Sequence, residues 1–336
     1  MFNRKGLKLL GLLAPLGVMS ASAQNPGERQ AALEGMATRT PAPLTSPPSR
    51  SEEGRKTVST AATETSDAGL QRVVTEKERA VEFDAGTTFS YLYRSNPLST
   101  NGVIGKAIKS GVAEIGTFVS ASLGNYEILN GVYTPRVGGG MSEVSLTRRE
   151  LDFADYRTQR VFLQGDLKYS SGWTLSSSLE YSSITSPKFN TEDYKEWFPS
   201  FSVAKSWVID EKSLLRASVS SGYRFTEVDS LGGSVPGVTA NRLDNWSNGL
   251  AVAYYRELFL GITGQVFGEL SNRSYSNGQN RNRNDLTKTV GSSLAYNWRI
   301  LRFLLFWNYT DRDSNLEINQ YHNLDFGASV TANFRF

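Results

Sequence analysis

The feature that most constrains the fold is a strict alternation of apolar and polar residues over the last stretch of the chain, residues 323–336. Leu324, Phe326, Val330, Phe334 and Phe336 all fall at even positions, and the odd positions between them carry polar residues or glycine. Successive side chains of a β-strand point to opposite faces. This stretch therefore predicts a long strand with one apolar face and one polar face.

The same alternation recurs along residues 80–336, in segments separated by turn-forming residues. Many segments exceed the roughly five or six residues of an average soluble strand, and their polar faces are rich in Ser, Thr, Gly and Asn, which suits a hydrated lumen. We therefore predict an all-β fold, an antiparallel up-and-down transmembrane β-barrel of about 12 strands. A soluble β-sandwich with a wet outer face is the competing interpretation. The expected strands cover residues 82–94, 112–124, 126–134, 156–169, 173–184, 195–208, 214–226, 243–256, 258–271, 285–299, 302–312 and 322–336.

The connections between these strands alternate in length. Short connections fall at 124–125, 170–172, 210–213, 256–257 and 299–301, and longer ones at 135–155, 227–242 and 272–284. Outer-membrane barrels have short periplasmic turns and longer external loops, so we expect the C-terminus to be periplasmic. The glycine-rich run at 102–140 makes the second and third strands ambiguous, and a barrel of ten strands is the alternative. Within that run, Gly138, Gly139 and Gly140 indicate a flexible external loop.

The N-terminal part of the chain has a different character. Residues 1–23 combine a basic start, an apolar stretch and a small-residue site, which predicts a secretory signal peptide cleaved after Ala23. Residues 24–79 are rich in Pro, Ser and Thr and have few large apolar residues, which is typical of a disordered tail. Residues 66–80 could form a short amphipathic helix before the barrel. The chain has no cysteine, so disulfides and thiolate metal sites are excluded.

The final residues also resemble a known sequence signature. Phe326, Val330, Phe334 and Phe336, in the alternating ending Val330–Phe336, resemble the C-terminal signature of Gram-negative outer-membrane β-barrel proteins. This resemblance implies recognition by the barrel-assembly machinery and residence in the outer membrane, in contact with its lipid and lipopolysaccharide. It covers only the last strand and does not identify a porin or enzyme family.

The polar faces assign a set of charged residues to the lumen. Basic and acidic residues are equally represented, which allows either ion pairs that cross and close the lumen or a weakly selective channel. The candidate lumen-lining residues are Asp84, Arg94, Glu114, Arg160, Asp166, Lys168, Glu180, Glu196, Arg216, Arg224, Glu269, Arg299, Asp325 and Arg335. Beyond these, Arg273, Arg281 and Arg283 belong to an expected external loop, for which solvated side chains are the favoured interpretation and contact with anionic lipopolysaccharide is the alternative.

The search for catalytic chemistry centres on the only histidine, His322. Asp311, Asp313 and Asp325 are close to it in sequence, but a hydrolytic triad needs a nucleophile that converges from elsewhere. We therefore expect no enzyme activity, no metal and no cofactor, and the balanced charge after residue 23 offers no footprint for nucleic acid.

The predicted function is porin-like passage of small hydrophilic solutes through a narrow lumen. We expect a monomer, because trimeric porins are larger. A non-conducting structural or adhesive barrel is the first alternative, and a rim hydrolase that uses His322 is the second.

Overall fold

The computed structural model describes residues 81–99, 107–188, 191–228 and 239–336. The predicted signal peptide, its cleavage site, the tail and the short helix lie outside these residues. Within the described ranges, no helix is both long enough and apolar enough to cross a bilayer.

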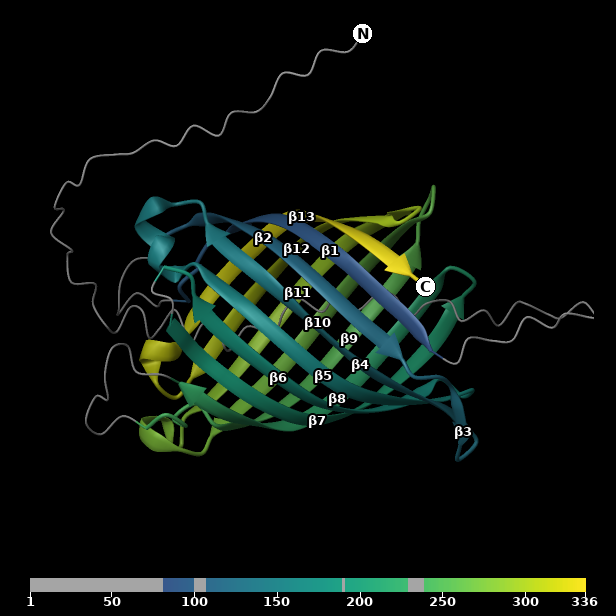
Figure 1. Ribbon diagram of the computed structural model, residues 1–336, viewed down its shortest axis with the longest axis horizontal. Coiled ribbons are helices and arrows are strands. Elements are labelled where there is room, and N and C mark those ends of the chain that lie inside the picture. The colour runs from purple at the N-terminus through teal and green to yellow at the C-terminus, as the bar shows by residue number, and fades with distance from the viewer. Residues whose placement is uncertain (1–80, 100–106, 189–190, 229–238) are drawn as a thin grey trace, which may run out of the picture.

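Antiparallel strands form most of the described structure (Figure 1). Consecutive strands pair with each other except β2 and β3, and β1 pairs with β13 from Asp84 opposite Arg335 to Arg94 opposite Asp325, which closes the sheet. Because β2 pairs directly with β4, the short β3 stands outside the ring, and the barrel has 12 strands. The strands are β1 Glu82–Arg94, β2 Ser110–Ser122, β3 Tyr126–Ile128, β4 Gly131–Leu146, β5 Tyr156–Tyr169, β6 Trp173–Ser186, β7 Thr191–Asp210, β8 Ser213–Val228, β9 Asn245–Glu257, β10 Ile262–Tyr275, β11 Asn284–Trp298, β12 Leu301–Ser314 and β13 Tyr321–Arg335. The predicted fold class is confirmed, and the alternative of ten strands is wrong.

The third strand of the ring differs from the prediction. Residues 126–134 do not form one strand, because Leu129 and Asn130 adopt positive φ angles and make a two-residue turn between β3 and β4. The expected external loop at 135–155 is largely the strand β4, with Gly138 and Gly140 near its middle. A Cβ atom at Gly138 would lie 2.7 Å from a ring carbon of Phe162 on β5. These glycines are therefore required by side-chain packing inside a strand, and the prediction of a flexible loop was wrong.

The two ends of the barrel carry different connections. One end, which holds the C-terminus, has short turns such as 170–172, 211–212 and 299–300 (Figure 1). The opposite end, called the loop end below, carries longer connections that contain three short 3₁₀ helices: η1 Arg149–Ala154, η2 Gly278–Asn280 and η3 Glu317–Asn319. This asymmetry matches the lengths expected from the sequence, and the placement of the short turns in the periplasm stays a prediction.

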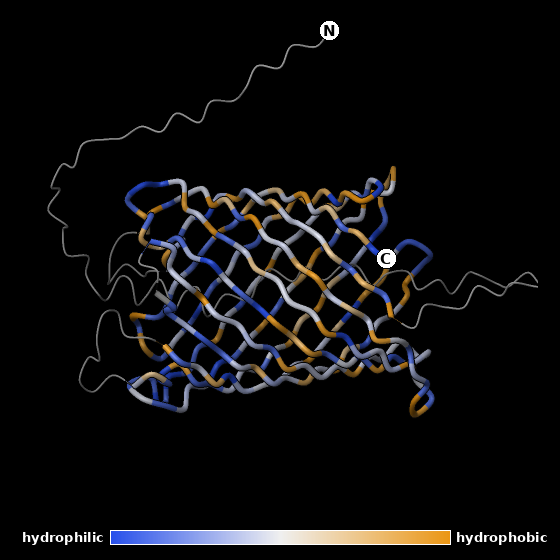
Figure 2. Tube along the Cα trace, viewed as in Figure 1, coloured by the Kyte–Doolittle hydropathy of each residue, from blue (hydrophilic) through white to orange (hydrophobic). Residues whose placement is uncertain are grey.

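The outer face of the barrel is apolar. Phe89, Val266 and Leu305 are among many large apolar side chains that point away from the lumen and are exposed, Val266 by 61%. Apolar positions recur along the wall between the two ends (Figure 2). Soluble proteins rarely expose apolar surface this extensive, whereas a closed barrel with an apolar exterior satisfies every backbone group inside a bilayer. The fold is therefore a membrane-spanning barrel.

Aromatic residues frame this apolar surface. Trp173, Trp207 and Trp298 lie near the short turns, and Trp197 and Trp246 lie nearer the loop end, all exposed on the outer face. Trp197 and Trp246 each pack against a neighbouring tyrosine, with ring centroids 4.9 and 5.1 Å apart. Such girdles match the two interfaces of a membrane, where one side of an indole ring is apolar and its N–H is hydrated.

Candidate functional site

The strand register determines which charged residues face the lumen. On β1, the outward positions are odd, because Phe89 and Tyr91 are the exposed apolar ones. The same parity passes from strand to strand through the pairing. The inward positions include Asp84, Arg94, Glu114, Arg160, Asp166, Lys168, Glu180, Glu196, Arg216, Arg224, Glu269, Asp325 and Arg335.

Arg299 is the exception among the predicted lumen residues. It lies in the turn between β11 and β12 with a positive φ of 55°. Its guanidinium carbon is 5.6 Å from the centre of the Trp298 ring, which is on the outer face. The expected inward position assumed that the strand continued to residue 299, but β11 ends one residue earlier.

The inward charges form ion pairs along the barrel wall. Arg94 Nε is 2.9 Å from Asp325 Oδ1 on the neighbouring strand. Three more pairs also join neighbouring strands: Arg160 with Glu180 at 2.5 Å, Arg224 with Glu196 at 2.6 Å and Arg335 with Asp84 at 3.0 Å. The ion pairs between described lumen residues thus run around the wall, and none of them crosses the barrel to an opposite strand. The two arrangements expected from the sequence, a closed lumen and a weakly selective channel, both stay predictions.

Inward phenylalanine rings also lie against the wall. Phe198 on β7 covers Gly222 on β8, and Phe267 on β10 covers Gly291 on β11. A Cβ atom at these glycines would lie 2.6 and 2.7 Å from the respective ring carbons. Because each glycine leaves room for a ring on the adjacent strand, these two rings pack against the wall of the barrel.

The lumen is accessible to solvent in its middle. Arg160 points inward and its side chain is 50% exposed, and the inward Ser220 is also exposed. Many other inward positions carry small residues, such as Ser176, Ser218 and Ala253. Asp166 is instead buried and accepts hydrogen bonds from Gln164 and Ser176. A barrel of 12 strands has a wider interior than an eight-stranded barrel that side chains fill.

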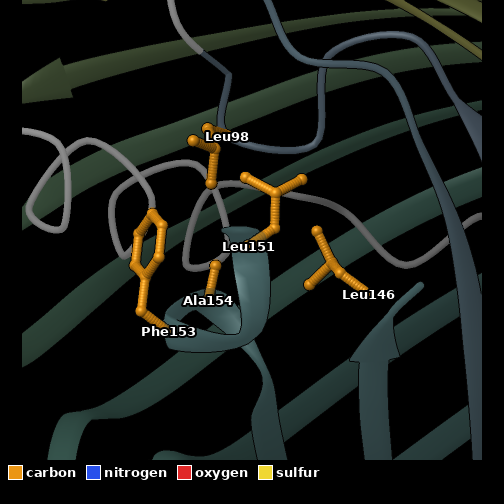
Figure 3. Packing of buried hydrophobic residues seen from close by; sticks show 5 residues of the cluster. All are labelled: Leu98, Leu146, Leu151, Phe153 and Ala154. Carbon is orange, nitrogen blue, oxygen red and sulfur yellow. The ribbon is translucent and has the colours of Figure 1, made fainter. Parts of the chain in front are cut away.

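The loop end is packed more tightly. Leu98 from the β1–β2 connection, Leu146 at the end of β4, and Leu151, Phe153 and Ala154 from η1 form a buried apolar cluster (Figure 3). A second cluster contains Leu92, Val112 and Val144, and a third contains Ile184, Tyr194, Val228, Leu243 and Tyr275. Tyr156 contacts both of the latter clusters, so apolar packing extends around much of this end.

A buried polar network at the loop end was not predicted from the sequence. Asp285 is fully buried, and its carboxylate accepts hydrogen bonds from Nε and Nη2 of Arg283 at 3.0 and 2.8 Å. Arg312 Nη1 is 3.9 Å from Asp285 Oδ2.

Arg273 lies on the adjacent strand β10, directly opposite Asp285 in the register. Both Arg273 and Arg283 are buried, so the predicted solvated loop and the alternative of contact with lipopolysaccharide are both wrong for these two residues. The period-two pattern of β10, continued two residues beyond 271, would have placed Arg273 inside the barrel.

His322 lies on the outer face, across from Asp311 on β12. Asp325 lies on the opposite face of the same strand and is held by Arg94. The wall of the barrel therefore separates Asp325 from His322, whereas Asp311 lies on the same face as His322. The described residues hold no group of three His, Cys, Asp or Glu side chains arranged to bind a metal ion.

Comparisons with known proteins give similarity in fold alone. No protein-family model matches the chain, and no curated protein matches it. Among solved structures, an outer-membrane channel from Pseudomonas putida F1 is 9% identical, with a TM-score of 0.49, over 79% of this chain and 100% of that one. The β domain of the Bordetella autotransporter BrkA is 11% identical, with a TM-score of 0.46, over 75% of this chain and 99% of that one. The translocator domain of the autotransporter NalP from Neisseria meningitidis is 11% identical, with a TM-score of 0.43, over 77% and 90%.

Proposed function

We propose that this outer-membrane β-barrel allows passive passage of small hydrophilic solutes through its lumen. The observation that carries the proposal is that inward residues halfway along the barrel, Arg160 and Ser220, are exposed although they point away from the membrane. Charged pairs that run along the wall keep this space polar without filling it. A polar lumen inside an apolar shell is the arrangement of barrels that conduct water and solutes.

The proposed channel narrows toward the loop end. Arg94 and Arg224 are mostly buried, and the apolar clusters around Leu92 and Tyr194 lie at the same end. We expect this end to set the size limit for solutes. The same packing supports the second candidate function, a structural barrel that is closed at the loop end and does not conduct.

We further propose a monomer that is inserted by the barrel-assembly machinery. The barrel closes through β1 and β13 of a single chain, so no second chain is needed to complete it. Phe326, Phe334 and Phe336 are exposed on the outer face of the last strand, where an assembly factor could reach them. The backbone of Phe336 forms two hydrogen bonds with Phe83, at 3.0 and 3.1 Å.

The test uses the absence of cysteine, which makes any introduced thiol unique. The full chain would be refolded into planar bilayers, and its conductance recorded before and after a negatively charged, water-soluble thiol reagent is added. Ser220→Cys places the thiol in the lumen, and the control Val219→Cys places it on the outer face of the same strand. We expect discrete conductance steps that the reagent reduces in Ser220→Cys but not in Val219→Cys.

Two results would count against passage. Refolded barrels of normal gel mobility that give no conductance steps would favour the closed structural barrel. Equal reagent effects at positions 219 and 220 would show that the current does not pass through the lumen.

A further inference from the structure

Among the described residues, Arg273 is an inward arginine that is buried without an ion-pair partner. Arg273 faces inward from β10, and only 2% of its surface is exposed. Its Nε and Nη1 atoms are buried and form no hydrogen bond. A buried guanidinium is ordinarily paired with an acceptor, because removing its N–H groups from water without replacement is unfavourable.

The carboxylates near Arg273 are already engaged or too far away. Glu196 accepts hydrogen bonds from Arg224 and from the Tyr194 hydroxyl. Asp285 accepts hydrogen bonds from Arg283 and lies close to Arg312. Glu269 interacts electrostatically with Arg273 but forms no ion pair with it. Four residues along one strand separate these two, or roughly 13 Å of backbone.

The strongest charged neighbours of Arg273 repel it. Arg224 and Arg312 both interact with it electrostatically. Each also retains one buried nitrogen without a hydrogen-bond partner, Nε of Arg224 and Nη2 of Arg312. Arg224 and Arg312 therefore both lie within electrostatic range of Arg273, and all three guanidinium groups have donors without an acceptor.

Aromatic rings hold the flanking guanidinium groups in place. The guanidinium carbon of Arg224 is 3.9 Å from the centre of the Phe198 ring, and that of Arg312 is 4.8 Å from the centre of the Tyr321 ring. Arg224 is further fixed by Glu196, and Arg312 donates from Nε to Thr287 at 3.3 Å. Held donors of like charge bind an anion with little cost in side-chain entropy.

We propose that Arg224, Arg273 and Arg312, called the arginine cluster below, bind a small anion that presents carboxylate or phosphoryl oxygens. The anion supplies the acceptors that Arg273 lacks and offsets the repulsion among the three positive charges. Guanidinium groups suit such oxygens because they can donate two parallel hydrogen bonds. The site deepens the proposed function by giving the channel a preference for anionic solutes, but binding itself does not require that the barrel conducts.

The test measures binding directly on the refolded full chain in detergent. Inorganic phosphate and succinate would be titrated separately, in a chloride medium of constant ionic strength, by isothermal titration calorimetry. We expect saturable binding of at least one of the two. A response to phosphate alone identifies phosphoryl oxygens as the ligand, and a response to succinate alone identifies carboxylates.

The variants assign the binding to the cluster. Arg273→Gln should weaken binding at least about tenfold, because it removes the charge and most of the donors. The matched control is Arg335→Gln, which removes an inward arginine at the opposite end of the barrel and should leave binding unchanged. Arg273→Met keeps most of the side-chain volume and serves if the glutamine variant does not refold.

Anion binding by the arginine cluster and passage of solutes through the lumen can be refuted independently of each other. Absence of saturable binding to the wild-type barrel, or equal affinities in wild type and Arg273→Gln, would overturn the anion site even if the barrel conducts. Binding without any conductance would leave the site standing and would instead remove the proposed passage of solutes.

Discussion

The two ends of the β1–β13 seam offer a measurable contrast between a buried and an exposed ion pair. At the loop end, Arg94 donates to Asp325 from Nε at 2.9 Å and from Nη2 at 3.2 Å, and the two side chains are only 13% and 11% exposed. At the other end of the same strand pair, Arg335 and Asp84 are 3.0 Å apart but 65% and 26% exposed. Both pairs face the lumen and join directly opposed residues.

The variant Asp325→Ala should lower the free energy of unfolding by about 3 kcal/mol, at the low end of the roughly 3–5 kcal/mol found when one partner of a buried pair is removed. The loss combines two charge-assisted hydrogen bonds with the cost of leaving Arg94 buried and unpaired. The low end applies because both side chains keep some exposure, 13% and 11%. Asp84→Ala removes an exposed pair and should cost less than about 1 kcal/mol.

Equilibrium urea unfolding of the barrel refolded into lipid vesicles, followed by tryptophan fluorescence, measures both values. A double-mutant cycle with Arg94→Ala separates the interaction from the effect of truncation, and we expect the double variant to lose less stability than the two single losses added. Equal losses in the free energy of unfolding for Asp325→Ala and Asp84→Ala would contradict the idea that burial makes the loop-end pair more stabilising than the exposed pair.

Two further predictions address the packing of the wall and the assembly of the barrel. Gly222→Ala should destabilise the barrel by about 1–3 kcal/mol in the same unfolding experiment, because the new Cβ overlaps Phe198, whereas Gly268→Ala, with nothing nearer than 4.0 Å, should be tolerated; equal effects would contradict the packing argument. Phe336→Ala should reduce the amount of folded barrel in cell envelopes, measured by heat-modifiable gel mobility, while refolding of the purified chain in vitro proceeds as in wild type. Unchanged levels in cells would contradict a role of Phe336 in assembly.

The barrel was predictable from the sequence because its determinant is local. Alternation along one strand decides which side chains meet lipid, and the outward Phe326 and Phe334 follow from it without any knowledge of the neighbouring strands. The same rule assigned Arg94 and Asp325 to the lumen. The assignment of Arg299 to the lumen was wrong because β11 ends at Trp298, so that Arg299 lies in the turn that follows.

Other features depend on contacts between strands and were not predictable in this way. Gly138 and Gly140 suggested a loop because glycine weakens an isolated strand, but the ring of Phe162 on β5 and the backbone oxygen of Thr117 on β2 leave no room for a Cβ atom at these two positions. Arg273 became a candidate site residue only when the partners of Glu196 and Asp285 were known. A sequence shows which residues are charged. That Arg273 lacks an ion-pair partner can be seen only from the distances between the charged groups in the structure.

The pairing of the first and last strands also has a consequence for biosynthesis. Asp84 and Arg335 are 251 residues apart in sequence, and the edge of β1 that faces β13 has no other partner in the ring. A ribosome makes β1 long before β13, so that edge stays unpaired throughout translation and export. Unpaired strand edges promote aggregation, and contacts this distant in sequence form slowly. The chain should therefore depend on periplasmic chaperones from the moment its first strand is exported until its last one arrives.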